Sequence, residues 1–303
     1  MKNLFKWISI CMLGVFLVVG TGCGNSSEQE KLVIASHNYA ETQILSEMVK
    51  QLLEANMDNI QIEHKRNFQG SSATQQALET GDVQFYVCYT GTQFTGVLGM
   101  EVTEEWKDRE KVYQYVKNKH HEKNGVKVFE PYGFNNTYCV AVRRETAEKL
   151  DLKKISDLVP HAAEMKVATD PTFMERKGDG WKEFAETYDL DFKDASGMAY
   201  DLMYQALKNK EVDAAVAYST DGRIATYDLV ALEDDKNFFP PYDAILLVKE
   251  DILEKYPEIE EIIAPLIGAI DNETMTELNS QVDTEKKEPA DVANGYLKEQ
   301  GLI

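Results

Sequence analysis

Shortages of cysteine, histidine and positive charge exclude several classes of function for this sequence. Among 303 residues there are 4 Cys and 5 His, and they form no Cys-x-x-Cys pair or other spaced zinc pattern. The chain has 32 Lys and Arg against 52 Asp and Glu, which gives a net charge of −20. Because nucleic-acid binding rests on clustered Lys and Arg, we expect no nucleic-acid partner. We likewise expect no metal ion and no cofactor.

The motifs of common catalytic centres are also absent from the sequence. It has no Gly-x-Ser-x-Gly elbow, no His-Glu-x-x-His pair and no P-loop. Its many carboxylates include no pair singled out by spacing. His120 and His121 lie in a charged helical stretch, where we expect both to be solvated. We therefore predict a protein that is not an enzyme.

An apolar run at the amino terminus is too short to span a bilayer comfortably. Lys2 and Lys6 precede the apolar residues 8–19, and small residues lie just before Cys23. This order of charge, apolar run and small residues predicts a secretory signal peptide over residues 1–22.

The end of this signal resembles the signals of bacterial lipoproteins. The resemblance implies that Cys23 becomes the lipidated first residue, and that the polar residues 23–30 form a tether. Gly20 departs from the pattern, because leucine is usual at that place. An ordinary cleaved signal and an uncleaved anchor are the alternatives.

Two stretches of the chain share one order of features. Residues 77–90 align without a gap on residues 206–219, and each reads as a helix end, a tight turn and a short buried strand. The strands end in Tyr89 and Tyr218, each followed by a hydroxyl residue. Ligands of open α/β sheets bind outside the carboxyl ends of the strands, so we expect these tyrosines on opposite walls of one cleft. Coincidence is the alternative, because a helix followed by a strand is common.

The order of strands and helices predicts an α/β protein with two lobes. Residues 127–131 and 227–237 are expected to cross between the lobes. The crossings place residues 31–129 and 234–303 in a discontinuous lobe I, and residues 130–233 in lobe II. Two crossings also predict a hinge.

Tyrosine recurs at the ends of the predicted strands, at Tyr89, Tyr138, Tyr218 and Tyr242. Electron-rich ring faces suit a cation that cannot donate a strong hydrogen bond, above all a quaternary ammonium group. Taken alone, any one of these tyrosines is better explained as a residue of the core or the rim, because intermediate burial is normal for tyrosine.

Cys88 and Cys139 stand next to two of these tyrosines. Strand side chains alternate between faces, so a tyrosine that faces the cleft directs its neighbouring cysteine into the packed interior. We therefore expect two buried free thiols. A disulfide between them is the alternative in an exported protein.

Five motifs, taken together and in order, resemble those of one known family. They are Tyr-Thr-Gly-Thr at 89–92, Tyr-Gly-Phe-Asn-Asn-Thr-Tyr at 132–138, Arg-Lys-Gly-Asp-Gly at 176–180, Ala-Tyr-Ser-Thr-Asp-Gly-Arg-Ile at 217–224 and Phe-Phe-Pro-Pro-Tyr at 238–242. The chain resembles the substrate-binding lipoproteins of osmoprotectant ABC importers, which are the glycine betaine/carnitine/choline-binding proteins of Gram-positive bacteria. The resemblance covers nearly the whole mature chain.

The resemblance implies a type II periplasmic-binding-protein fold that captures quaternary ammonium solutes between its lobes. It maps an aromatic cage onto Tyr89, Tyr138, Tyr218 and Tyr242. It also implies a cognate ABC permease as partner, and a location on the extracytoplasmic face of the cell membrane through the lipid on Cys23.

Two polar positions refine the expected site. An aspartate at the end of the Tyr-Thr-Gly-Thr motif would repel a ligand carboxylate, whereas Thr92 can donate a hydrogen bond to one, so zwitterions such as glycine betaine and carnitine are expected ligands. His37 lies where relatives can carry glutamine. We expect it at the cleft mouth, where its ring either meets a ligand carboxylate or bonds only to its own turn.

Two rival functions remain open at this level. One is a binding protein of the same fold for another small molecule such as an amino acid, for which arginine and aspartate clamps would be expected. The other is an exported enzyme or an adhesion protein. The sequence does not rank betaine, carnitine, choline and proline betaine.

Overall fold

The computed structural model describes residues 29–37, 39–68, 71–175 and 180–303. The predicted signal, Cys23 and nearly all of the tether lie outside these residues, as does most of the motif at 176–180. Within the described ranges, no helix is both long and apolar enough to cross a bilayer.

The first of two five-stranded sheets has the strand order β2-β1-β3-β10-β4. In it β1 runs parallel to β2 and β3, and β10 runs antiparallel to β3 and β4. The bounds are β1 (Glu30–His37), β2 (Ile60–Phe68), β3 (Phe85–Tyr89), β4 (Val126–Val128) and β10 (Ala244–Lys249). The last strand comes from far along the chain, so this sheet is built from discontinuous sequence.

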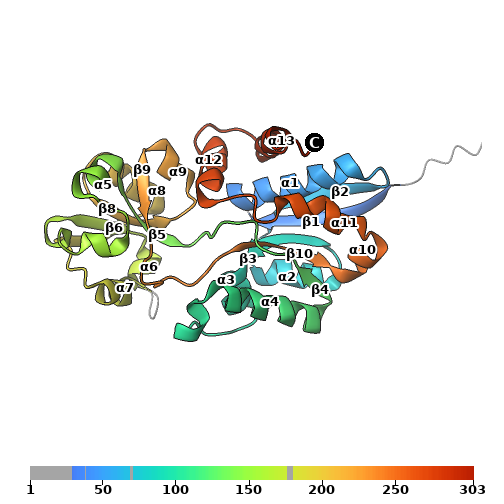
Figure 1. Cartoon of the computed structure of the whole chain (residues 1–303), viewed down its shortest axis with the longest axis horizontal. Coiled ribbons are helices and arrows are strands. Elements are labelled where there is room, and N and C mark those ends of the chain that lie inside the picture. The colour runs from blue at the N-terminus through green and yellow to red at the C-terminus, as the bar shows by residue number, and fades with distance from the viewer. Residues whose placement is uncertain (1–28, 38, 69–70, 176–179) are drawn as a thin grey trace, which may run out of the picture.

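The second sheet repeats this plan, with the order β7-β6-β8-β5-β9. Here β6 runs parallel to β7 and β8, and β5 runs antiparallel to β8 and β9. The bounds are β5 (Tyr138–Arg143), β6 (Lys166–Thr169), β7 (Asp194–Gly197), β8 (Ala214–Tyr218) and β9 (Leu229–Leu232). Figure 1 shows the two sheets in two separate lobes, each with helices around it.

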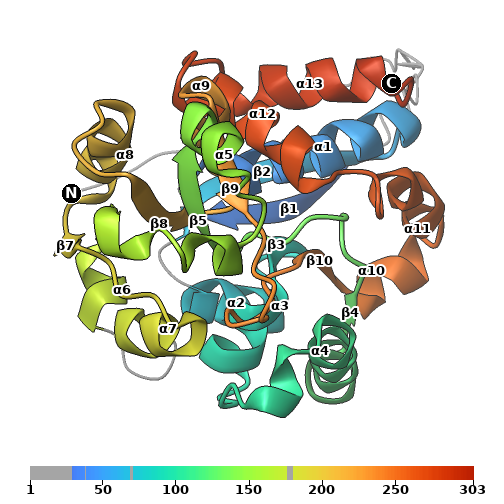
Figure 2. The same cartoon turned by 60° about the vertical axis from the view of Figure 1, so that its left-hand side comes forward.

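Helices associated with the first sheet come from both parts of the chain. They are α1 (Ala40–Asn56), α2 (Ser71–Thr80), α3 (Thr90–Thr92), η1 (Gln93–Val97), η2 (Glu104–Lys107), α4 (Arg109–Asn124), α10 (Glu250–Lys255), α11 (Glu258–Ile263), η5 (Ala264–Leu266), α12 (Asn272–Asp283) and α13 (Pro289–Glu299). Of these, α12 contacts both α1 and α9, a helix of the other lobe. The carboxyl-terminal part of the chain therefore reaches across to the second lobe, as Figure 2 also shows.

The second lobe contains shorter helices. They are α5 (Arg144–Leu150), η3 (Ile155–Leu158), η4 (Ala162–Glu164), α6 (Pro171–Glu175), α7 (Trp181–Tyr188), α8 (Tyr200–Lys208) and α9 (Gly222–Thr226). Buried apolar residues form clusters on the two faces of each sheet.

The repeat expected from the sequence is confirmed by the topology. β3 and β8 are both the third strand of their sheets. The turn before each strand uses a left-handed residue at the same place in the alignment, Gly81 with φ 84° and Lys210 with φ 65°. Each strand ends in one of the predicted tyrosines, so the repeated unit delivers Tyr89 and Tyr218 to matching positions.

The apolar stripe of α1 anchors the first lobe. Its residues Ile44, Leu45, Met48, Val49, Leu52 and Leu53 are all at most 2% exposed. Burying one such side chain contributes roughly 1.5–3 kcal/mol. The same helix packs against β1, β2 and α13, which fixes the direction of its amino-terminal turn.

Both predicted crossings begin too early. Lys127 and Val128, expected in the first crossing, belong to β4, which pairs antiparallel with β10. The second crossing shows the same error. Leu229–Leu232 is not part of a connection but β9, the edge strand that pairs antiparallel with β5. Leu229 and Leu232 are 3% and 2% exposed, so their burial holds this strand in the second sheet. The segments between the sheets run over residues 129–137 and 233–243. We retain residues 31–129 with 234–303, and 130–233, as the proposed lobe limits.

Two other predictions concern single buried residues. The expectation that both histidines are solvated is wrong for His120 and correct for His121, which is exposed. His120 is fully buried on the inner face of α4, and this burial lowers its pKa to about 4. Cys88 and Cys139 are free and buried, as expected from strand alternation.

Candidate functional site

A cavity of about 980 Å³ lies between the lobes. The four tyrosines singled out in the sequence all line it, and so does Thr92. They reach it from four places: the ends of β3 and β8, the start of β5, and the second connecting segment. The carboxyl ends of two topologically equivalent strands thus meet at one site, as open α/β sheets require.

Tyr138 and Tyr218 form a pair on the wall supplied by the second lobe. They are direct cross-strand partners in the β5–β8 ladder. Their ring centroids lie 4.9 Å apart, and their hydroxyl oxygens are 3.3 Å apart. Tyr218 is 37% exposed, so its ring presents free area to the cavity.

Tyr39 and Tyr89 form a second pair on the wall of the first lobe. Their rings are stacked, with centroids 6.4 Å apart and an interplanar angle of 18°. Tyr39 is 42% exposed and was missed in the sequence. The signal was present in the sequence, because Tyr39 follows the end of β1 just as Tyr89 ends β3.

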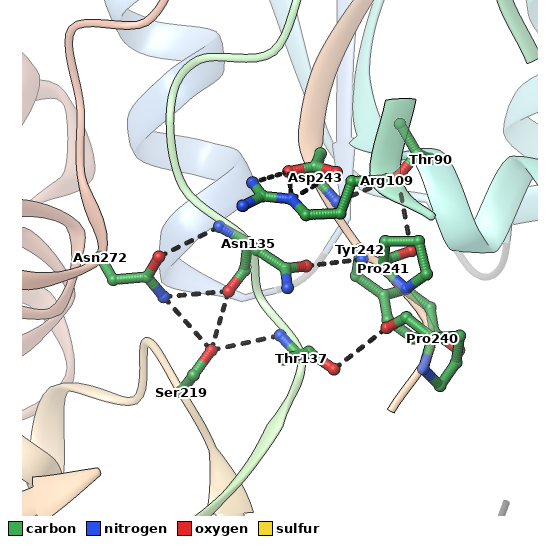
Figure 3. A network of polar contacts seen from close by, with 10 residues as sticks. All are labelled: Thr90, Arg109, Asn135, Thr137, Ser219, Pro240, Pro241, Tyr242, Asp243 and Asn272. Carbon is green, nitrogen blue, oxygen red and sulfur yellow. Dashed lines mark hydrogen bonds and ion pairs between the residues drawn. The ribbon is translucent and has the colours of Figure 1, made fainter. Parts of the chain in front are cut away.

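Tyr242 owes its place to contacts around the connecting segments. Its backbone N–H donates to Oδ1 of Asn135 at 2.6 Å, and Figure 3 shows this bond between the two segments. The Cβ of any larger residue at Gly91 would lie 2.9 Å from the Tyr242 ring and 2.5 Å from the Pro241 carbonyl oxygen. The glycine of the Tyr-Thr-Gly-Thr motif therefore makes room for Tyr242.

Glu41 is an acidic residue of the cavity wall that sequence reasoning missed. It is 2% exposed. Its Oε1 accepts hydrogen bonds from the Tyr89 hydroxyl at 2.5 Å and from Asn136 Nδ2 at 3.0 Å, and its Oε2 accepts from Asn279 Nδ2 at 2.9 Å. Burial raises the pKa of Glu41, and the hydrogen bonds that it accepts oppose this rise.

A charged cluster occupies another part of the wall. The Arg223 guanidinium donates to both carboxylate oxygens of Asp221, at 2.9 and 2.8 Å, and lies 4.5 Å from the Tyr204 ring centroid. Asp283 of α12 lines the same region; burial raises its pKa, the Asp221 charge adds to the rise, and Arg223 opposes it.

The structure does not bring His37 to the cavity wall. Its Nδ1 lies 3.2 Å from the Phe68 carbonyl oxygen, so Nδ1 donates, and its Nε2 accepts from the Tyr86 hydroxyl at 2.7 Å. Burial lowers the His37 pKa, against a smaller opposing effect of the Phe68 hydrogen bond. Both ring nitrogens are thus engaged inside the first lobe, and the ring favours its neutral form.

The cavity offers ring faces and hydrogen-bonding groups. Across the described residues, no three His, Cys, Asp or Glu side chains are placed to hold a metal ion. These groups suit reversible capture of a small molecule that touches both lobes.

Comparison with known proteins places the chain in a family. The sequence model of the "substrate binding domain of ABC-type glycine betaine transport system" matches residues 30–299. This chain belongs to that family. The resemblance read from the five motifs is therefore confirmed. The assignment implies a small-molecule ligand, a membrane permease partner and a place on the extracytoplasmic side.

Similar proteins extend over the whole chain. The carnitine transport binding protein OpuCC of Listeria monocytogenes is 41% identical, with 100% of this chain and 98% of the relative covered. The ergothioneine transport permease/binding protein EgtU of Helicobacter pylori is 32% identical over 92% of this chain and 49% of that longer protein. A crystal structure described as a glycine betaine/carnitine/choline ABC transporter has a TM-score of 0.86, with 37% identity and coverage of 89% and 99%. This likeness confirms the predicted α/β, two-lobed periplasmic-binding-protein fold.

Proposed function

We propose that this protein binds quaternary ammonium compatible solutes, namely glycine betaine, carnitine and choline, and presents them to an ABC permease. The observation that carries the proposal is the gathering of tyrosine rings from both lobes on one cavity. Cation–π attraction is strongest for a cation that is removed from water, and a quaternary ammonium group has no N–H bond that would require an acceptor.

Thr92 supports the inclusion of zwitterions among the ligands. It lines the cavity beside the tyrosines, and its hydroxyl can donate a hydrogen bond to a ligand carboxylate. The similarity to a carnitine transport binding protein agrees with a zwitterionic ligand. His37 takes no part in the proposed site, because its ring nitrogens are bonded elsewhere.

The proposed anchor is a lipid on Cys23 after removal of residues 1–22. The small residues before Cys23 and the polar stretch that follows support it. Mass spectrometry of the membrane fraction should find a diacylated amino terminus at Cys23. A soluble mature protein cleaved elsewhere would contradict the anchor but not the binding function.

Isothermal titration calorimetry of residues 29–303 tests the ligand class. The panel consists of choline, glycine betaine, carnitine and ergothioneine, with glutamine as an amino acid control. We expect saturable binding of at least one quaternary ammonium compound and none of glutamine. Binding of the amino acid alone would overturn the proposal in favour of the rival ligand class.

The cage makes a residue-by-residue prediction. Each alanine variant of Tyr89, Tyr138, Tyr218 and Tyr242 should weaken choline binding by roughly tenfold or more, because a desolvated cation–π contact contributes up to about 2 kcal/mol and 1.4 kcal/mol is tenfold. Tyr138→Phe should lose less, since the ring face remains. Tyr115→Ala, outside the cavity, is the control. Parent-like affinity in two of the four alanine variants would refute the cage.

A further inference from the structure

Glu41 differs in its partners from Asp221, another acidic residue of the cavity wall. Within the described part of the chain, no Lys or Arg nitrogen lies within 4.0 Å of its carboxylate, whereas Asp221 is matched by Arg223. Its hydrogen-bond partners are all neutral side chains, those of Tyr89, Asn136, Asn279 and Thr220. It is therefore a nearly buried acid that has hydrogen bonds but no counter-ion.

The hydrogen bonds of Glu41 suit the ionised form of its carboxyl group. Every one of them is a bond that the carboxylate accepts, and an ionised carboxylate can only accept. Glu41 also lies in the first turn of α1, where the helix dipole favours negative charge. Both effects oppose the cost of burial, which by itself favours the neutral acid.

A buried charge without a partner is costly, and a cation brought close to it relieves part of that cost. The Tyr89 hydroxyl connects Glu41 directly to a ring of the proposed cage. A ligand cation seated on that ring would lie in the field of the carboxylate, next to two side chains, Tyr89 and Glu41, that are only 6% and 2% exposed. The field would act on the charge of the ligand, whereas the ring faces also respond to its shape and surface.

We propose that Glu41 is the fixed counter-charge of the cavity and a specificity-determining residue, which makes binding depend on the positive charge of the ligand head group. This inference rests on the proposed function. It adds that a net cation such as choline gains more from Glu41 than a zwitterion does, because the carboxylate of the zwitterion is repelled by the same charge.

A structural role is the competing explanation. Glu41 ties α1 to β3 through Tyr89, to a connecting segment through Asn136, and to α12 through Asn279. Loss of these bonds would weaken every ligand to a similar extent, whatever its charge. Discrimination between a charged and an uncharged ligand of the same shape separates the two roles.

The decisive experiment compares Glu41→Gln with the parent on choline and on 3,3-dimethyl-1-butanol, in which carbon replaces the charged nitrogen. Dissociation constants come from calorimetry, with competition for the weaker ligand. We expect choline to weaken by roughly tenfold, as loss of one nearby charge in a partly desolvated site implies. The uncharged alcohol should change by less than about twofold. Equal losses on both ligands, or no loss on either, would overturn the proposal.

Two further variants separate the charge of Glu41 from its hydrogen bonds and from an effect on folding. Tyr89→Phe removes one donor to Glu41 but keeps the charge, so the ratio of choline to alcohol affinity should stay within about threefold of the parent ratio. If melting curves show that Glu41→Gln is unfolded, Glu41→Asp decides: it retains the charge and should retain the ratio, and a folded Asp variant with a tenfold lower ratio refutes the role.

Failure of the inference is distinguishable from failure of the proposed function. If the parent protein binds no quaternary ammonium compound, the proposed function is wrong. If the parent binds choline and Glu41→Gln keeps the parent ratios of choline to the alcohol and of choline to glycine betaine, only the role of Glu41 is wrong.

Discussion

Gly91 shapes the cavity wall because it lacks a side chain. The space that a Cβ at this position would need is occupied by the ring of Tyr242 and by the Pro241 carbonyl group. The Thr90 hydroxyl next to it accepts from the backbone N–H of Asp243 at 3.0 Å. The Tyr-Thr-Gly-Thr motif thus packs against the second connecting segment and also contributes Tyr89 and Thr92 to the cavity wall.

Gly91→Ala should therefore impair ligand binding through Tyr242. The added Cβ would lie 2.5 Å from a backbone oxygen, so the segment that carries the ring has to move. We expect choline affinity to fall by roughly tenfold, comparable with loss of one cation–π contact. Gly96→Ala is the matched control, because a Cβ there meets no atom within 4 Å. Equal affinity in the two variants would contradict this account.

Secondary-structure elements of the first lobe are joined by a buried polar contact between α1 and β2. Glu47 of α1 is 4% exposed. Its Oε1 lies 2.7 Å from Nδ1 of His64 and 2.8 Å from Nη2 of Arg66, both on β2. Burial by itself would raise the pKa of Glu47, but the hydrogen bonds from His64 and Arg66 outweigh it and lower the pKa to about 2.

This contact predicts a pH dependence of stability. Because the pKa of Glu47 is lower in the folded state than its ordinary value of 4.5, the contribution is complete above about pH 4.5 and is lost as pH falls toward 2. It amounts to roughly 3 kcal/mol. As the pH falls from about 4.5 toward 2, the free energy of unfolding measured in urea should decrease less for Glu47→Gln than for the parent.

The control for this prediction is Glu63→Gln on β2, the strand that carries His64 and Arg66. The Glu63 carboxylate is more exposed than that of Glu47 and pairs with Lys31 at the surface. Such pairs contribute little, so its pH profile should follow that of the parent. A Glu47→Gln profile parallel to the parent profile would mean that the depressed pKa does not stabilise the fold.

The whole molecule has two lobes joined by two neighbouring segments. Besides the bond from Tyr242 to Asn135, the Thr137 hydroxyl donates to the Pro240 carbonyl oxygen at 3.2 Å (Figure 3). Asn272 donates to the Asn135 carbonyl oxygen at 2.9 Å. Hydrogen bonds thus hold the two segments beside each other, and we expect the lobes to turn about them as a pair.

Ligand binding should bring the lobes together. A ligand that touches rings from both walls stabilises the closed form by its differential affinity for that form. Small-angle scattering should show a smaller radius of gyration with saturating choline than without it. At a choline concentration near the dissociation constant of the parent, Tyr218→Ala should show a smaller decrease in radius than the parent, because it binds choline more weakly. An unchanged radius in the saturated parent would contradict closure.

The sequence by itself determined the features that depend on neighbouring residues. Short apolar runs, turn residues and the alternation of strand faces were enough to place Tyr89 and Tyr218 at equivalent strand ends and to bury Cys88 and Cys139. The repeat then implied that the two ends face one site. These inferences succeed because they involve local periodicity and one rule of sheet topology.

Only the tertiary structure decided which polar residues reach the cavity. In the sequence Glu41 is an ordinary acid in the first turn of a helix, but its partner Asn279 lies 238 residues away. His37 sits at the end of β1, yet Tyr86, 49 residues along the chain, binds its Nε2 inside the lobe. His120 and β9 were misread for a related reason, since their burial comes from elements packed against them. Partners so distant in sequence leave no local periodicity, and they meet only when the lobes and α12 have assembled.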